Sequence, residues 1–391
     1  MKHRIVVLGA GYAGAIAAGR LARRLHPDDT EITVVNAVPD FVERVRMHQL
    51  ATGQELEHRE LSDIYAGTGV HVRLARVTAV DADRKTVALD DGELSYDTLV
   101  YALGSAAADH GVPGVAEHAY DLAGRQSALR LRERLTDLAA GGTVLVVGGG
   151  LTGVEAATEI AEARPDLRVA IAARGGLGDW LNEKAQRHLR AVFDRLGIAV
   201  HEHTEIARVE PAGAVTADAR TIPAQLTVWT AGFSVHPIAA ASTLRVAGTG
   251  QIVVDATMRS VSHPDVYAIG DAALADGPGG KPLRMSCASG TPMAWQAADA
   301  IAARLTGRRI PKAPLRYFNQ CISLGRRDGI IQFVTADDRA KPSLITGKVA
   351  ARYKEFVCKG AAWGVVHPML MLPVRRRRVT AIGTEIVATP S

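Results

Sequence analysis

Two glycine-rich segments contain the residues best suited to chemistry in this 391-residue sequence. Residues 9–14 read Gly-Ala-Gly-Tyr-Ala-Gly, and residues 148–153 read Gly-Gly-Gly-Leu-Thr-Gly. Both have the spacing G-x-G-x-x-G, in which the first glycine makes a tight turn, the second lets the backbone approach a diphosphate, and the third lets a helix pack on a strand. The diphosphate would lie at the amino terminus of that helix, where unpaired N–H groups favour negative charge. The sequence therefore predicts two dinucleotide sites.

The residues around these segments predict the elements that position them. An apolar run at residues 4–8 precedes the first segment, an Ala-rich helical stretch follows it to Leu25, and another apolar run covers residues 31–35. The second segment has the same surroundings, at residues 143–147, 154–163 and 167–172. Strand, glycine turn, helix and strand make a β-α-β unit. The predicted fold class is α/β, with two Rossmann-like dinucleotide-binding domains and a small C-terminal α+β region.

Three further predictions concern elements outside these units. Thr86–Leu89 and Tyr96–Tyr101 predict two strands joined by a hairpin turn at residues 90–92. Pro292–Leu305 predicts a helix, and another is expected near residues 345–356.

The residue after the second strand of each unit refines the ligand, because an acid there usually binds ribose hydroxyls. The first unit has Asn36, which can still form a hydrogen bond to a hydroxyl. The second unit has Ala173 and then Arg174. An Arg at this edge can pair with a 2′-phosphate, so NADPH is at least as good a candidate as NADH. The alternative is that Arg174 is only a solvated surface charge.

The composition is that of a soluble globular protein, with 47% hydrophobic and 22% charged residues. The net charge of +5 comes partly from the four Arg at residues 375–378, and aromatic residues make up 5%, so nucleic acid is not expected as a partner. Cys287, Cys321 and Cys358 are widely spaced and predict neither a disulfide framework nor a zinc site. Without a signal peptide or a membrane-spanning run, the expected location is cytoplasmic, with peripheral contact to the inner face of the membrane as an alternative.

These motifs resemble those of the two-dinucleotide-fold flavoproteins, which include type II NADH dehydrogenases, apoptosis-inducing-factor-like reductases, ferredoxin reductases and disulfide reductases. The resemblance covers residues 4–307. Its five motifs occur in the order of the family, at residues 9–14, 96–104, 148–155, 229–232 and 268–272. It implies that FAD binds to the first unit and NADH or NADPH to the second. The implied domains are an FAD domain at residues 1–112 and 245–310, an inserted NAD(P) domain at 113–244, and a C-terminal interface or acceptor domain at 311–391.

The resemblance and the glycine pattern together assign candidate contacts. Those for FAD are Gly9, Gly11, Tyr12, Ala13, Gly14, Asn36, Arg44, Val77, Ala102, Gly104, Gly270 and Asp271. Those for NAD(P) are Gly148, Gly150, Thr152, Gly153, Glu155, Arg174 and Gly232. Glu155 is the one candidate for a catalytic role, through contact with the nicotinamide, and a first-turn carboxylate favoured by the helix dipole is its alternative. Arg44 and Arg46 are candidates for the FAD phosphate or flavin N1, against a solvated basic helix face.

The sequence departs from parts of the family. No Cys precedes Cys287, so the thiol-dependent branch is excluded. The helix at residues 292–297 is similar to the Ala-Gln-rich helix of the quinone pocket in type II NADH dehydrogenases but lacks a second Gln one turn on. The apolar segment at residues 360–373, followed by the Arg run, indicates a membrane-facing tail by analogy. An ordinary packed or dimer-forming tail is the alternative.

The predicted function is hydride transfer from NAD(P)H to FAD and on to a quinone or another non-thiol acceptor. Two alternatives stay open: a flavoprotein with slow NAD(P)H turnover that acts in sensing or assembly, and a specialised oxidoreductase of a soluble small molecule. A homodimer is a further open alternative. Glu202 lies between His201 and His203, and residues of these types can bind a metal. Ordinary surface residues are the better interpretation, and no metal is predicted.

Overall fold

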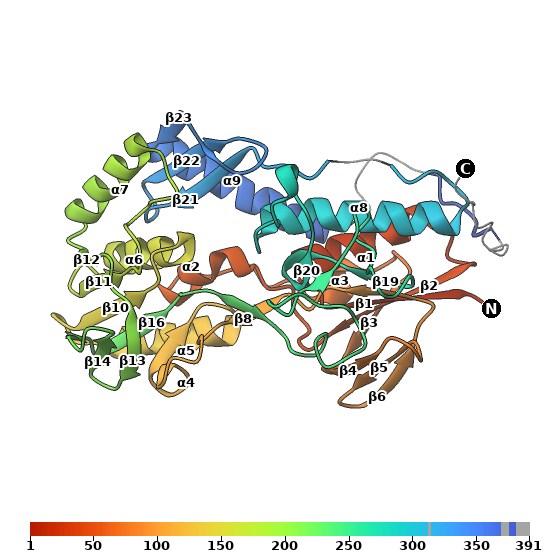
Figure 1. Ribbon diagram of the computed structural model, residues 1–391, viewed down its shortest axis with the longest axis horizontal. Coiled ribbons are helices and arrows are strands. Elements are labelled where there is room, and N and C mark those ends of the chain that lie inside the picture. The colour runs from red at the N-terminus through yellow and green to blue at the C-terminus, as the bar shows by residue number, and fades with distance from the viewer. Residues whose placement is uncertain (312–313, 369–374, 381–391) are drawn as a thin grey trace.

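The computed structural model describes residues 1–311, 314–368 and 375–380. Two five-stranded parallel sheets lie toward opposite ends of an elongated molecule, and a small antiparallel sheet lies above the left-hand one, with one long helix running from it toward the middle (Figure 1). The α/β class with two dinucleotide-binding units, predicted from the sequence, is confirmed. No helix among the described residues is long and apolar enough to cross a membrane.

The first sheet has the strand order β19-β7-β1-β2-β3, with every pair parallel. Its strands are β1 (His3–Leu8), β2 (Thr30–Asn36), β3 (Val70–Leu74), β7 (Thr98–Tyr101) and β19 (Val266–Ala268). Strand β7 is buried along its whole length, as expected for a central parallel strand covered on both faces. Helices α1 (Tyr12–Arg24) and α8 (Cys287–Leu305) lie together over this sheet (Figure 1). The short helices α2 (Met47–Ala51) and α3 (Leu61–Ile64) separate β2 from β3 along the chain.

The second sheet repeats this plan with the order β12-β11-β10-β16-β9, again all parallel. Its strands are β9 (Ala119–Asp121), β10 (Thr143–Val147), β11 (Arg168–Ala172), β12 (Ala199–His201) and β16 (Leu226–Trp229). Its helices are α4 (Val115–His118), α5 (Arg125–Asp137), α6 (Leu151–Ala163) and α7 (Glu183–Arg195). The Asn182 side chain caps α7 by accepting a hydrogen bond from the Ala185 N–H at 2.9 Å.

Smaller sheets complete each half. They are β4 (Val77–Asp81), β5 (Thr86–Leu89) and β6 (Gly92–Ser95) in the first half, and β13 (Ile206–Glu210), β14 (Gly213–Thr216) and β15 (Thr221–Pro223) in the second. A two-stranded sheet is formed by β18 (Ile252–Val253) and β20 (Ala273–Leu274). The chain crosses between the halves twice, along β8 (Ser105–Ala107) and β17 (Phe233–Val235), which pair antiparallel. The second sheet is thus built by a segment inserted into the first.

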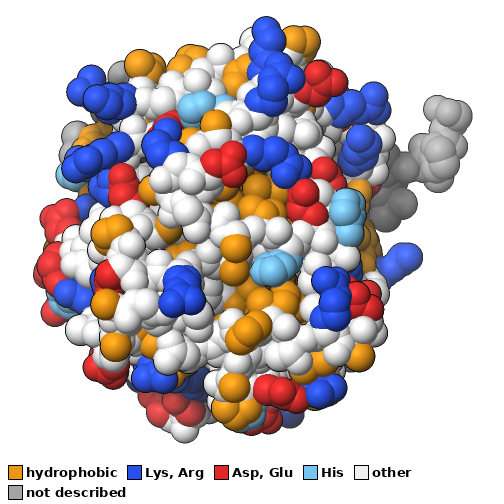
Figure 2. Space-filling model, turned by 90° about the vertical axis from the view of Figure 1, so that its left-hand side faces the viewer, with side chains coloured by type: hydrophobic (Ala, Val, Ile, Leu, Met, Phe, Trp, Pro, Cys, Tyr) orange, Lys and Arg blue, Asp and Glu red, His pale blue; other side chains and the backbone are white. Residues whose placement is uncertain are grey.

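The C-terminal region consists of β21 (Asn319–Ser323), β22 (Gly329–Val334), β23 (Ala340–Thr346) and the helix α9 (Gly347–Val366). The three strands form an antiparallel sheet, and α9 runs from it toward the centre of the molecule (Figure 1). On the face formed by the second sheet and this region, Lys, Arg, Asp and Glu side chains are interspersed (Figure 2). That face lacks the continuous basic stripe typical of nucleic-acid binding.

Three sequence-based element predictions were wrong in detail. Thr86–Leu89 pairs with Gly92–Ser95, whereas Thr98–Tyr101 joins the parallel sheet, where all four of its residues are buried between neighbouring strands and both faces are covered. Helix α8 begins at Cys287 and contains Pro292 inside it. Helix α9 continues to Val366 and ends before Pro368, which disfavours a helical residue in front of it. The domain boundaries after residues 112, 244 and 310 stay predictions.

Candidate functional site

A single large cavity follows the junction between the two sheets. Its volume of about 2240 Å³ exceeds the roughly 300–1,000 Å³ of an ordinary small-molecule pocket. Gly11 of the first glycine turn and Gly150 of the second both line it, together with residues of α2, α8 and α9. The cavity is therefore large enough, and placed, for two dinucleotides that meet end to end.

The first glycine turn is packed tightly everywhere except at its middle glycine. A Cβ on Gly14 would collide with the carbonyl oxygen of Gly9, and a Cβ on Gly9 would collide with that of Ala102. Gly9 also has a φ of +94°, which residues with side chains rarely adopt. A Cβ on Gly11, in contrast, would meet nothing within 4 Å, and Gly11 faces the cavity. The backbone is thus open at the one position where a diphosphate has to approach α1.

The second glycine turn has the same arrangement. A Cβ on Gly153 would collide with the carbonyl oxygen of Gly148, and a Cβ on Gly148 would lie 2.7 Å from Thr230 Oγ1. Gly150 again has nothing within 4 Å and lines the cavity. Both turns therefore fit a dinucleotide diphosphate at the start of the following helix.

Asn36 and Arg174 occupy the strand ends where ribose recognition was predicted. Asn36 Oδ1 accepts the Ala10 N–H at 2.9 Å, and Asn36 Nδ2 donates to the Val38 carbonyl at 2.7 Å. Asn36 is not among the residues that line the cavity, so its side chain primarily fastens the first glycine turn. Arg174 is exposed and lines the cavity beyond the second turn.

A polar cluster faces the cavity where the chain crosses between the halves. Ser105 Oγ donates to Asp271 Oδ2 at 2.6 Å, and Arg44 Nη1 donates to the Ser105 carbonyl at 2.7 Å. Arg44 also lies 3.7 Å from Asp271 and stacks on Phe233, with 4.9 Å between the guanidinium carbon and the ring centre. Arg44 Nη2 is buried without a hydrogen-bond acceptor in the described part of the chain. A buried unpaired donor beside the cavity fits a ligand that supplies an oxygen acceptor.

Glu155 and Lys354 form a buried ion pair in the cavity wall. Lys354 Nζ lies 3.0 Å from Glu155 Oε1, which also accepts hydrogen bonds from Ser323 N at 2.9 Å and Ser323 Oγ at 3.1 Å. Burial raises the pKa of Glu155, but Lys354, His48 and the Ser323 hydrogen bond together outweigh burial and hold that pKa below its usual value. Burial lowers the pKa of Lys354, but Glu155 and the neighbouring thiols together outweigh burial and raise that pKa. The pair is therefore charged, and its proton is held on Lys354 beside the cavity.

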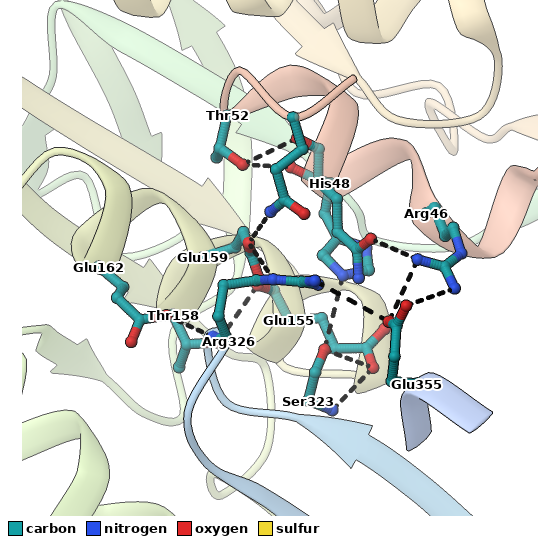
Figure 3. Close-up of polar contacts among 12 residues, drawn as sticks. Arg46, His48, Thr52, Glu155, Thr158, Glu159, Glu162, Ser323, Arg326 and Glu355 are labelled. Carbon is teal, nitrogen blue, oxygen red and sulfur yellow. Dashed lines mark hydrogen bonds and ion pairs between the residues drawn. The ribbon is translucent and has the colours of Figure 1, made fainter. Parts of the chain in front are cut away.

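More polar side chains lie around Glu155 (Figure 3). His48 lines the cavity, with Nε2 3.5 Å from Ser323 Oγ. Burial lowers the pKa of His48 to about 4, so the imidazole is neutral at physiological pH. Arg46, in contrast, lies outside the cavity lining and pairs with Glu43 at 3.1 Å and Glu355 at 3.1 Å.

All three cysteines line the same cavity, although they come from α8, β21 and α9. Burial raises the pKa of Cys321 and of Cys358 to about 11, and it also raises that of Cys287. They are therefore neutral thiols, which are poor nucleophiles. Their sequence spacing gave no indication that they would share a wall.

The structure brings most of the predicted contacts to the cavity. Those that line it are Gly11, Tyr12, Ala13, Arg44, Ala102, Gly104, Gly270, Asp271, Gly148, Gly150, Thr152, Glu155, Arg174 and Gly232. Gly9, Gly14, Asn36, Val77 and Gly153 do not line it. The three glycines among these shape the turns, and Val77 is buried in β4 beside Arg76, which does line the cavity.

The structure also locates four residues that bear on lesser interpretations of the sequence. Arg46 belongs to the ion pairs above, and neither the flavin-binding nor the solvated interpretation holds for it. Gln296 of α8 donates to the Pro311 carbonyl at 3.2 Å and does not line the cavity. Arg378 pairs with Asp29 at 2.9 Å and Asp28 at 3.1 Å, so it is engaged by its own chain, and residues 369–374 of the predicted tail lie outside the described residues. Glu202 pairs with Arg190 at 2.6 Å, and no cluster of metal-binding residues occurs in the described ranges.

Sequence reasoning missed the residues that the C-terminal region contributes. Lys354, Cys358 and Trp363 line the cavity from α9, and Ser323 binds Glu155 from β21. Trp295 of α8 also lines the cavity. No local signal distinguished Lys354, because α9 also carries Lys348, Arg352, Glu355 and Lys359.

Comparisons with known proteins agree with this geometry. Residues 3–302 match the family model described as pyridine nucleotide-disulphide oxidoreductase. An NADH dehydrogenase-like protein of Mycobacterium tuberculosis is 31% identical over 316 residues, 74% of this chain and 78% of the relative. The NADH dehydrogenase-like protein YutJ of Bacillus subtilis is 27% identical, over 83% and 91% of the two chains. Demethylphylloquinone reductase of Synechocystis is 28% identical, over 84% and 86%.

Solved structures share the fold at lower identity. The sulfide:quinone oxidoreductase of Aquifex aeolicus superimposes with a TM-score of 0.79 at 19% identity, covering 94% of this chain and 92% of that one. NDH2 of Plasmodium falciparum in complex with NADH gives 0.78 at 14% identity, covering 95% and 98%. Two glycine turns that face one cavity, and a family model that spans both, lead to one assignment. This chain belongs to the pyridine nucleotide-disulphide oxidoreductase family and is a flavin- and NAD(P)-dependent oxidoreductase.

Proposed function

We propose that this protein oxidises NADPH or NADH through FAD and reduces a quinone. The observation that carries the acceptor is the rim of the cavity on α8 and α9. Trp295, Val357 and Trp363 line the cavity and are 39%, 36% and 50% exposed, respectively. An opening edged by exposed apolar side chains suits an acceptor that is itself apolar. Quinone reduction also agrees with the demethylphylloquinone reductase among the relatives.

FAD is the flavin that suits the first half of the cavity. Gly11 is open to a diphosphate, while Asp271 and Arg44 supply an acceptor and a donor for the remaining polar groups of the dinucleotide. A bound flavin supplies the two-electron chemistry, taking a hydride from the nicotinamide and passing electrons to the acceptor. The chain orients the two dinucleotides, and the Glu155–Lys354 pair holds a proton beside the acceptor end.

NADPH is the better candidate for the second half. Ala173 removes the carboxylate that would repel a 2′-phosphate, and Arg174 supplies a positive charge at the cavity edge. The Asp or Glu that would bind the ribose hydroxyls of NADH is absent at this strand end.

Membrane contact is proposed through α9 rather than through the Arg run. Val349, Tyr353 and Phe356 are exposed at helical spacing. Exposed Lys348, Arg352 and Lys359 lie on the same helix. An apolar helix face with basic neighbours favours an anionic lipid surface, from which a quinone would enter the rim. A homodimer through this face would compete with that contact.

Anaerobic rapid mixing tests the function. We expect fast flavin bleaching with NADPH or NADH, followed by many turnovers on a short-chain quinone analogue. W363E should lower quinone turnover and leave turnover with a soluble one-electron acceptor intact. The matched variant F356E, on α9 but outside the cavity lining, should instead reduce binding to anionic vesicles. Slow bleaching to a long-lived charge-transfer complex, without quinone turnover, contradicts the proposal and favours a sensing role.

A further inference from the structure

Three glutamates of α6 form a stripe from the cavity toward the surface. Glu155, Glu159 and Glu162 are spaced by four and three residues, which places them on one face of the helix. Glu155 and Glu159 are buried, with 4% and 2% of their surface exposed, and Glu162 is partly exposed. The turn between β21 and β22 covers this face, and Arg326 reaches across it (Figure 3). The outer end of the stripe meets that turn, where Glu162 accepts the backbone N–H of Arg326.

Glu159, in the middle of the stripe, is incompletely paired. Its Oε1 accepts a hydrogen bond from Gln54 Nε2 and lies 4.0 Å from Arg326 Nε. Its Oε2 is buried and has no partner in the described part of the chain. A buried carboxylate oxygen without a donor is costly, and protonation removes much of that cost. Burial accordingly raises the pKa of Glu159 to about 7, so this side chain exchanges a proton near neutral pH.

The charged groups around Glu159 do not return its pKa to the usual Glu value. Glu155 and Glu162 on α6 both oppose its ionisation, while Arg326 from the β21–β22 turn favours it. Arg326 is shared with Glu355 of α9, from which it lies 3.9 Å. His48 on the α2 side is neutral near pH 7, since its pKa is about 4. Among the described residues, Arg326 is the cation that favours ionisation of Glu159, and it is divided between two carboxylates.

The proposed reaction requires a proton from solvent. The nicotinamide C4–H bond breaks and delivers two electrons with one proton, as a hydride. A quinone gains two electrons, and both of its oxygens form an O–H bond, so the second proton is taken up from water. The overall balance is NAD(P)H plus a proton plus quinone giving NAD(P)⁺ plus hydroquinone. A quinone that fills the apolar opening would exclude water from the acceptor end, so this proton needs another route.

We propose that Glu159 relays this solvent proton to the Glu155–Lys354 pair and so to the acceptor end of the cavity. This inference rests on the proposed quinone reduction. The pair gives one proton to the acceptor, Glu159 returns one to the pair, and solvent at the Arg326 edge reprotonates Glu159. Glu155 and Glu159 are one helical turn apart, about 5–6 Å between their Cβ atoms, a gap that one water molecule bridges. Glu159 touches neither dinucleotide and acts only through Glu155.

The test compares E159Q with E162Q, which alters the same helix face at its exposed end, and with E159D, which keeps a titratable group. In stopped-flow experiments on the FAD-loaded protein, flavin reduction by NAD(P)H should be equal in all four proteins. Flavin reoxidation by a short-chain quinone should be slower in E159Q by roughly 10²-fold, as expected for a lost proton donor. Reoxidation by ferricyanide, which takes up no proton, should not change. E159D should recover part of the rate, and E162Q should resemble the wild type.

A second measurement is independent of turnover. The native pKa of about 7 lies above the ordinary Glu value of 4.5, so the folded protein binds more protons between these values. The wild type should therefore lose stability as the pH rises from 5 to 8, and E159Q should not show this loss.

The outcomes separate the two claims. A wild type that reduces ferricyanide but no quinone overturns the proposed function, and the relay with it. Quinone turnover that is intact in the wild type and equally fast in E159Q overturns the relay alone. So does a loss of rate that is the same for quinone and ferricyanide, because it indicates a structural defect.

Discussion

Helices α1 and α6 follow the two glycine turns with the same backbone arrangement but carry opposite side chains. Two, six and nine residues after the last glycine of each turn, α1 has Ile16, Arg20 and Arg23, whereas α6 has Glu155, Glu159 and Glu162. Arg20 pairs with Asp299 of α8 at 2.6 Å, and Glu155 pairs with Lys354 of α9 at 3.0 Å. The glycine pattern thus sets where a diphosphate is held. The element packed on each helix differs, and α6 contributes the carboxylate of Glu155 to the cavity lining where α1 contributes Ile16.

Adding a methyl group to the last glycine of each turn should have the largest effect, and that effect should differ between the two units. Because a Cβ on Gly14 would collide with the Gly9 backbone, G14A should yield protein with almost no bound flavin. G153A makes the equivalent collision with Gly148, so it should keep its flavin and lose reduction by NAD(P)H. Overpacking of this kind costs about 1–3 kcal/mol or more, which is roughly 10–100-fold in affinity. The flavin absorbance of the purified proteins and their bleaching with NADPH measure both effects.

The control for this pair is the middle glycine. G11A adds a Cβ that meets no protein atom within 4 Å, so it should fold normally and weaken only flavin binding. Loss of flavin from G153A, or an unaffected flavin content in G14A, would contradict the assignment of the two turns.

Replacing a residue of α6 by its counterpart in α1 tests the contact between α6 and α9. E155I places on α6 the residue type that α1 has at this position, and it leaves Lys354 buried without its partner. Breaking a buried ion pair from one side costs about 3–5 kcal/mol of unfolding free energy. The double variant E155I/K354M removes both charges and should regain most of that loss, in denaturant unfolding of the FAD-loaded protein. Equal instability of the single and double variants would argue that the pair is not what holds α9 to α6.

The sequence alone predicted the features that depend on local spacing. The two β-α-β units and the open position in each glycine turn follow from patterns within about thirty residues. Asp271 was instead implied by the family resemblance. Arg44 and Arg46 show the limit of such patterns. They lie two residues apart, yet one reaches Ser105 across the cavity and the other pairs with Glu355 of α9.

The contribution of the C-terminal region to the cavity could not be predicted from local patterns either. Lys354 can pair with Glu155 only because α9 lies against α6, and no local pattern links residues about 200 positions apart. The Tyr96–Tyr101 strand was misassigned to a hairpin because Gly92–Ser95 is too short and too polar to stand out as a strand. A parallel neighbour from a distant part of the chain then provides the burial that Thr98–Tyr101 needs.

The residues at the ends of β2 and β11 also differ between the two units. Substituting Arg174 tests this difference at the second unit. A hydrogen-bonded charge pair with a phosphate contributes about 1.5–3 kcal/mol, so R174A should lower kcat/KM for NADPH by roughly 10–100-fold. The value for NADH should change less than twofold, because NADH has no 2′-phosphate. A173E should shift preference toward NADH by repelling that phosphate and accepting ribose hydroxyls. An unchanged ratio in R174A would mean that its guanidinium is only a solvated charge.

Asn36 at the first unit should give the smallest effect, and one of a different kind. N36A removes the acceptor for Ala10 N–H and the donor to the Val38 carbonyl, at about 0.5–1.5 kcal/mol each. We therefore expect a lower unfolding free energy and a weaker hold on flavin, with no change in the ratio of NADPH to NADH turnover. N36D keeps the acceptor and loses the donor, so it should fall between N36A and the wild type. If N36A instead retains full stability and binds flavin several-fold more weakly, the Asn36 side chain contacts the ligand directly, and the two strand ends are more alike than their hydrogen bonds indicate.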